Sequence, residues 1–307
     1  MERINGFDYL RSFAAFSVVW IHGCVTNPTM ELLSVINNYA VPAFILMSIY
    51  LLCAKYQEFP NIAFMVFFKR LVKRIIPQFA FWTIIYILLK YLKSHFLHTD
   101  FSISIKTIVE GGVAVQTWFL PAIFIWQIVA FSTFKMYKNC CIDLFLAIVL
   151  FVAGYFLIKN NIVDQGFETC IATYSGYVFI ASFLYKIRKK VTKTHSSTLG
   201  IACIIFFCVY LLHHNFVLNI ICCSSFFLFF MTCKFKRNRL IELFSVHSFG
   251  IYLVHFVFLQ SFAVLCKILY LDISTLMMTL LNIILAFGGS FLISYVFKKN
   301  SVLSKFV

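Results

Sequence analysis

Charged side chains are scarce in this sequence. Asp, Glu, Lys and Arg make up 12% of its 307 residues, whereas soluble domains carry about 25%. A chain with so few charges cannot cover a surface in water, which excludes a soluble globular domain. No low-complexity segment and no appended soluble domain interrupts it, so we expect one membrane domain over residues 1–307.

The 11 cysteines lack the spacing of a metal or disulfide site. The sequence contains no CxxC pair and no paired spacing of Cys with His, and most cysteines lie within or beside apolar runs, as Cys140-Cys141 and Cys222-Cys223 do. We therefore expect thiols that pack as small apolar side chains, and no bound metal.

Apolar runs fill most of the chain. Hydrophobic residues make up 62% of it, and the mean hydropathy is +0.92. Runs of about 17–25 residues are long enough to cross a bilayer, so the sequence predicts an all-α, polytopic membrane helix bundle of about ten transmembrane helices. We expect Phe59–Phe68 to lie along the membrane interface. The expected spans are residues 7–27, 38–55, 75–92, 115–134, 141–158, 168–185, 198–213, 215–233, 243–266 and 274–297.

The cations alternate between the two ends of these spans. With the N-terminus in the cytoplasm, 21 of the 26 Lys and Arg fall on the cytoplasmic side, as the positive-inside rule requires. This predicts that both termini are cytoplasmic. It also explains the net charge of +15 as a topology signal, so the expected partner is a lipid bilayer and not a nucleic acid. The cations on the other side are Lys90, Lys93, Lys106, Lys159 and Lys267.

The first helix carries polar residues inside an apolar run. Ten residues separate Arg11 from His22, so the two side chains share one helical stripe, about 16–17 Å apart along the axis. A cation and an imidazole inside a membrane are costly unless they face a polar cavity. We hypothesise that this helix lines a passage, with Arg11 near its cytoplasmic mouth and His22 deep inside. No small-x-small cleavage site follows His22 before the next span, so we expect this helix to remain in the mature protein.

Four stretches of the chain, in this order, resemble the membrane acyltransferase 3 family, of the polysaccharide O-acetyltransferase type. They are Arg3–Arg11 followed by His22, the basic stretch Lys69–Pro77, the tract Trp118–Pro121 and the late Ser248–His255. One departure is the sequence Ser48-Ile49, where the family usually has a Ser-Gly pair. A missing Gly removes a site of close backbone approach, which bears on the packing of the second helix more than on catalysis.

The resemblance implies a transfer reaction and roles for the polar residues of the first and third helices. The donor would be acetyl-coenzyme A, and His22 would act as the general base, because a neutral imidazole is suited to proton transfer near neutral pH. Arg11, Arg70 and Arg74 would bind the donor's phosphates, since guanidinium forks match phosphate oxygens. Asp8, three residues before Arg11, would orient it. The alternatives are a hydrogen-bonded structural His22 and cations that only anchor the topology.

The acceptor would be a hydroxyl of a cell-surface or lipid-linked polysaccharide. Ser248, Tyr252 and His255 lie near one face of a late span, at a depth close to that of His22, and could bind the acceptor or an oxyanion. Interhelical hydrogen bonding explains them equally well. Trp118 is either an interfacial anchor or an aromatic floor for a sugar ring.

We place the enzyme in a bacterial inner membrane as a multi-pass protein. A polysaccharide exporter or flippase without acyl-transfer chemistry is the alternative, because polar residues facing a bundle interior would serve it too. A receptor or scaffold gives no reason for the Arg11–His22 stripe.

Overall fold

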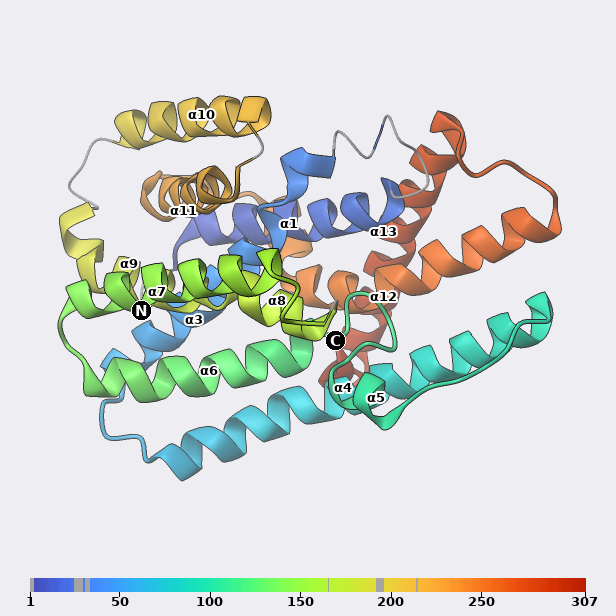
Figure 1. Cartoon of the computed structure of the whole chain (residues 1–307), viewed down its shortest axis with the longest axis horizontal. Helices are drawn as coiled ribbons and strands as arrows, with labels where there is room; N and C mark the ends of the chain where they lie inside the picture. Colours follow the sequence, from blue (N-terminus) through green and yellow to red (C-terminus); the bar gives the residue numbers. More distant parts are fainter. Residues whose placement is uncertain (1–2, 25–29, 31–33, 165, 192–195, 214) are drawn as a thin grey trace. The chain divides into compact units, whose positions relative to one another are not determined.

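The computed structural model describes residues 3–24, 30, 34–164, 166–191, 196–213 and 215–307. Every regular element among them is a helix (Figure 1). The chain divides into two compact units, each assembled from separate stretches of sequence. Unit 1 comprises residues 1–14, 38–68 and 122–242, and unit 2 comprises residues 15–37, 69–121 and 243–307.

Unit 1 contains the helices of the middle of the chain. Within it α7 packs on α8 and on α9, α9 packs on α3, and α10 packs on α11. A Cβ at Gly154 of α7 would collide with the carbonyl of Ala172 in α8, so the missing side chain allows these two helices to touch. The helices are α3 (Ala40–Glu58), most of α6 (Phe119–Met136), α7 (Cys140–Lys159), α8 (Phe167–Tyr174), α9 (Gly176–Val191), α10 (Ser196–His213) and α11 (Phe216–Thr232).

A buried ion pair joins α7 to α9 in unit 1. Lys186 Nζ lies 2.5 Å from Asp143 Oδ2, and the two side chains are 11% and 1% exposed. Lys186 also donates to the carbonyl of Tyr137, at 2.6 Å. Charges taken out of water require such partners.

Unit 2 contains most of two long helices, α4 (Phe64–Leu97) and α12 (Arg239–Ile268), with the short α5 (Ile105–Val109) and α13 (Leu276–Lys299). The C-terminal 3-10 helix η3 (Leu303–Phe306) packs on α13, and Trp82 of α4 donates its indole N–H to the carbonyl of Phe306 at 2.7 Å. Between α12 and α13, His247 Nδ1 lies 3.0 Å from Ser294 Oγ. These contacts hold α4, α12, α13 and η3 together within unit 2.

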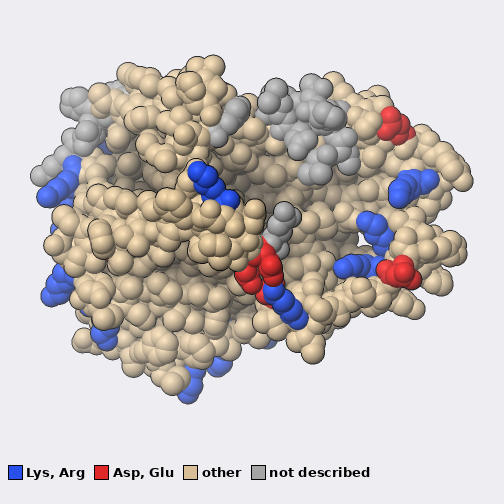
Figure 2. Space-filling model, in the orientation of Figure 1, with Lys and Arg blue, Asp and Glu red and all other residues tan. Residues whose placement is uncertain are grey.

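Seven helical segments are long and apolar enough to cross a membrane, among the residues that the structure describes. Together with the predominantly uncharged surface in Figure 2, they confirm an all-helical, multi-pass membrane protein. Two further apolar helices, Thr198–His213 and Phe216–Thr232, are shorter, and α1 (Asn5–Gly23) has 19 residues. The count of about ten spans therefore stays a prediction.

Two expected segments differ in their helix boundaries, although Phe167–Val191 as a whole stays one segment long and apolar enough to cross a membrane. The sixth span divides into α8 and α9 around Ser175, whose hydroxyl donates to the carbonyl of Ile171 at 2.7 Å and accepts the Trp126 indole N–H at 3.0 Å. Part of the expected interfacial segment Phe59–Phe68 belongs to α4, which has 34 residues. Such a helix is about 50 Å long and extends well beyond a hydrocarbon core of about 30 Å.

Candidate functional site

The helix that carries Arg11 and His22 is unbroken. α1 runs from Asn5 to Gly23, so the regular rise and the shared stripe expected from the sequence apply to both residues. Arg11 is half-buried, and so is His22. A Cβ at Gly23, next to His22, would collide with the side chain of Ile283 in α13. The end of α1 is thus packed tightly within unit 2.

The imidazoles of His22 and His255 stack on each other. Their ring centroids lie 5.4 Å apart with the planes inclined by 22°, and both residues belong to unit 2. Phe256 is placed edge-on to His22, with centroids 6.0 Å apart. The sequence suggested only that these two imidazoles reach a similar depth, and the structure brings them into contact.

The His255 ring is fixed by its own helix. Its Nδ1 lies 2.7 Å from the carbonyl oxygen of Tyr252 and 3.2 Å from that of Ile251. A carbonyl oxygen can only accept, so Nδ1 carries the proton, and in the neutral ring Nε2 carries the lone pair. His255 is 0% exposed, and its Nε2 has no hydrogen-bond partner among the described residues. An oriented basic nitrogen is therefore buried beside His22.

Tyr252 connects α12 to the segment before α6. Its hydroxyl donates to the carbonyl of Gln116, so the hydroxyl proton is not available to donate to a ligand. The Gln116 side chain is buried beside the Tyr86 hydroxyl, and its amide atoms form no hydrogen bond of regular geometry in the described part of the chain. Nearby on α4, the Tyr86 hydroxyl donates to the carbonyl of Leu253 at 2.6 Å. Buried polar groups without partners are costly in an apolar surrounding, so a polar ligand that reached these atoms would be stabilised by them.

A run of aromatic rings leads from Trp118 toward the imidazole pair. Trp118 is half-buried and packs edge-on to Phe119, with centroids 6.0 Å apart. Phe119 lies 5.4 Å from Tyr252, and Tyr252 lies 6.2 Å from His255. Ser248 is buried on the same helix, but its hydroxyl donates to the carbonyl of Ser245 at 2.8 Å. The hydroxyl protons of Tyr252 and Ser248 are thus donated to backbone carbonyls, whereas Nε2 of His255 has no partner among the described residues.

Arg70 and Arg74 lie one turn apart on α4, and both are exposed. No ion pair of Arg70 occurs among the described residues. Two exposed guanidinium groups at this spacing suit the oxygens of a phosphorylated ligand.

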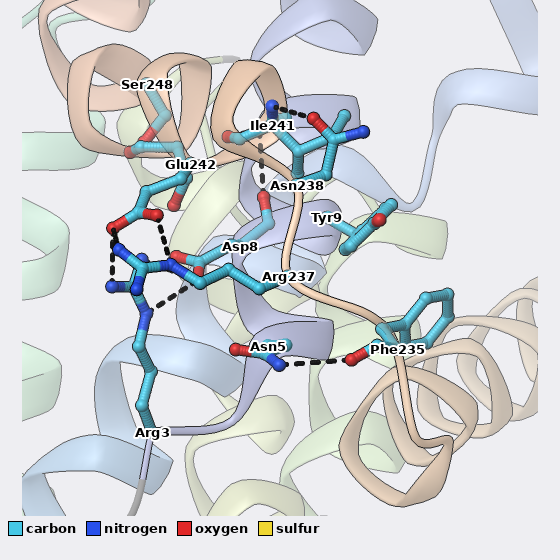
Figure 3. A network of polar contacts seen from close by, with 12 residues as sticks. Arg3, Asn5, Asp8, Tyr9, Phe235, Arg237, Asn238, Ile241, Glu242 and Ser248 are labelled. Atoms are coloured by element: carbon cyan, nitrogen blue, oxygen red, sulfur yellow. Dashed lines mark hydrogen bonds and ion pairs between the residues drawn. The ribbon is translucent and has the colours of Figure 1, made fainter.

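Asp8 has a different main partner from the one expected. Arg3 binds it through Nη2 at 2.9 Å and Nε at 3.0 Å. Arg11 interacts with the Asp8 carboxylate only through the electrostatic attraction of their charges, without a hydrogen bond. Arg3 also binds Glu242 at 2.6 Å, and Arg237 binds Glu242 at 2.8 Å (Figure 3). Its hydrogen bonds to Glu242 and Asp8 raise the pKa of Arg3. Asp8 thus belongs to a four-residue charge network of unit 1.

Sequence reasoning missed Tyr86, Gln116 and Phe256. Each is a polar or aromatic side chain in an apolar run, which does not distinguish it from many others in the sequence. The sequence alone does not show which residues face one another across helices. No group of three or more His, Cys, Asp or Glu that could hold a metal ion occurs in the part of the chain that the structure describes.

Comparison with known protein families gives one finding on this chain as a whole. The family model described as an acyltransferase domain, that of the acyltransferase 3 family, matches residues 4–299. Neither the curated proteins nor the solved structures yield a match.

Proposed function

Because the chain belongs to the acyltransferase 3 family, we propose that it moves an acetyl group from cytoplasmic acetyl-coenzyme A to a hydroxyl of a cell-surface or lipid-linked polysaccharide. Family membership and the apolar helices make it a membrane acyltransferase. The donor, the acceptor and a location in a bacterial inner membrane are the proposal. Family membership does not favour the alternative of an exporter without chemistry.

The stacked pair of His22 and His255 carries the proposal. In the reaction, His22 takes the proton of the acceptor hydroxyl as its oxygen attacks the thioester carbonyl. The carbon–oxygen bond forms, the carbon–sulfur bond breaks, and His22 returns the proton to the departing thiolate. His255, whose Nδ1 is held by carbonyls, presents Nε2 to the same space and can accept a hydrogen bond from the acceptor hydroxyl.

Arg11, Arg70 and Arg74 bind the phosphates of the donor in this proposal. Exposure of Arg70 and Arg74 on α4 and the half-buried place of Arg11 on the stripe of His22 support it. An extended pantetheine arm spans a length comparable to the rise of about 16–17 Å between Arg11 and His22. Asp8 contributes its charge near Arg11, while Arg3 is its direct partner.

The acceptor side is assigned to Trp118, Ser248, Tyr252 and His255. Trp118 offers a ring face for the sugar. Tyr252 acts by positioning, because its carbonyl receives His255 Nδ1 and its hydroxyl binds Gln116. Ser248 keeps its hydroxyl proton on its own helix and can only accept from a ligand.

The test is consumption of radiolabelled acetyl-coenzyme A by the purified protein. Replacing His22 with Ala should lower the rate by about 100-fold or more, the range for loss of a general base. His247→Ala is the matched control, because His247 is another buried imidazole and its partner is Ser294. Thioester consumption that is absent, or that does not depend on His22, would refute the proposal and favour the exporter.

A further inference from the structure

A cavity of about 360 Å³ lies in unit 2 between the last turns of α4, the segment around residue 113 and the second half of α12. Most of its wall is apolar, and the polar lining includes two lysines. It is lined by Tyr86, Leu89, Lys90, Leu92, Lys93, Phe96, Val113, Ala114, Phe256, Val257, Gln260, Ser261 and Val264.

The two lysines are not neutralised by the protein. Lys93 Nζ donates to Gln260 Oε1 at 2.6 Å, which fixes the ammonium group at the cavity. Neither Lys90 nor Lys93 forms an ion pair with a carboxylate among the described residues. Two cations without a counter-ion, beside an apolar wall, complement a ligand that is anionic at one end and apolar along the rest.

A hydrogen-bonded turn holds the part of the cavity wall formed by Val113 and Ala114. Gly111 adopts a positive φ of 71°, and the Thr117 hydroxyl donates to the carbonyls of Gly111 and Ala114. The Thr117 oxygen also accepts from the Ala114 N–H, at 3.2 Å. This tight turn holds the two small side chains, both buried, against the cavity.

The cavity adjoins the imidazole pair through Phe256. The Phe256 ring lies 6.4 Å from that of Tyr86, which also lines the cavity, and 6.0 Å from that of His22. Phe256 therefore separates a ligand in this cavity from His22, because its ring contacts both.

We propose that this cavity binds the phosphate-bearing membrane lipid that carries the acceptor sugar, with the phosphate on Lys90 and Lys93. The lipid chain lies along the apolar residues of α4 and α12, from Leu89 to Val264. A free polysaccharide would leave this apolar wall in contact with water, and it carries no phosphate to pair with Lys90 and Lys93. The inference rests on the proposed function, because it names the lipid-linked form of its acceptor.

The test measures lipid binding to the purified full chain in a neutral detergent by native mass spectrometry, with geranylgeranyl phosphate as probe and geranylgeraniol as its uncharged counterpart. The double variant Lys90→Gln/Lys93→Gln should weaken phosphate binding by about tenfold or more, since two charge-assisted contacts are lost. Binding of the alcohol should not change. Lys159→Gln/Lys267→Gln is the matched control, because these lysines share the predicted side of the membrane and do not line the cavity.

A second variant, Val264→Trp, fills the cavity and should weaken both probes. Unchanged phosphate binding in the Lys90/Lys93 variant, or an equal loss in the Lys159/Lys267 variant, would overturn the proposal. So would phosphatidylglycerol binding that is as tight and depends on the same lysines, because the cavity would then be an ordinary phospholipid site. No thioester enters the experiment, so its failure is separate from a failure of the acetyl-coenzyme A assay.

Discussion

Nδ1 of His255 lies 2.7 Å from the carbonyl oxygen of Tyr252, three residues earlier on α12, and this bond decides which nitrogen of the ring is basic. In a fully buried histidine with only a structural role, both ring nitrogens would be expected to have a hydrogen-bond partner. Here Nε2 has no partner among the described residues, although the ring is 0% exposed. A hydrogen bond from the substrate to Nε2 would offset the free-energy cost of burying this nitrogen without a partner.

The first prediction separates the two nitrogens of His255. Asn can place its amide N–H near the position of Nδ1 and has nothing at Nε2, so His255→Asn should keep the fold. If Nε2 takes part in proton transfer, acetyl transfer should fall by about 100-fold or more. The measurement is the rate of acetyl-coenzyme A consumption together with the thermal unfolding temperature in detergent. His247→Asn should keep most of the activity. Wild-type rates in His255→Asn would leave His255 a structural role only.

The second prediction concerns the buried pair of Lys186 and Asp143. Lys186→Met leaves an uncompensated carboxylate that is 1% exposed, which should cost about 3–5 kcal/mol of stability. The double variant Asp143→Leu/Lys186→Met should recover most of that loss, since an apolar pair of similar volume needs no counter-charge. Thermal unfolding of the purified protein measures both. Lys190→Met, at an exposed position of the same helix, should change stability little. A double variant as unstable as Lys186→Met would contradict this account.

The sequence predicts the helical class well, because hydrophobic run length and charge position are local properties. It also places Arg11 and His22 on one helix, which α1 confirms. The break at Ser175 is not visible in the sequence, because a partner 49 residues away, Trp126, satisfies the Ser175 hydroxyl.

The candidate site is less predictable for the same reason. A buried His255 can be recognised by its residue type, but the rings of His22 and Phe256 beside it come from the packing of helices far apart in sequence. Asp8 illustrates the point. Its spacing favours Arg11, and the structure gives it Arg3, from the segment that precedes the helix.

The third prediction addresses the number of spans. If α10 and α11 both cross the membrane, a reporter fused after His213 should lie on the opposite side from one fused in the basic cluster 186–190. The cluster itself should read cytoplasmic. Paired fusions of alkaline phosphatase and green fluorescent protein at the two positions measure this. The same readout at both positions would reduce the expected count by two spans, and a periplasmic cluster would overturn the orientation.

The fourth prediction tests the contact between α12 and α13 at Gly250. A Cβ at Gly250 would collide with the Ser294 side chain, which also binds His247. Gly250→Ala should therefore force the helices apart at a cost of about 1–3 kcal/mol. Gly288→Ala on α13 is the control, since nothing lies within 4 Å of its added Cβ, and it should not destabilise the protein. Thermal unfolding in detergent compares the two variants. Equal stability would show that the helices accommodate the methyl group, and that Gly250 is not required for their close approach.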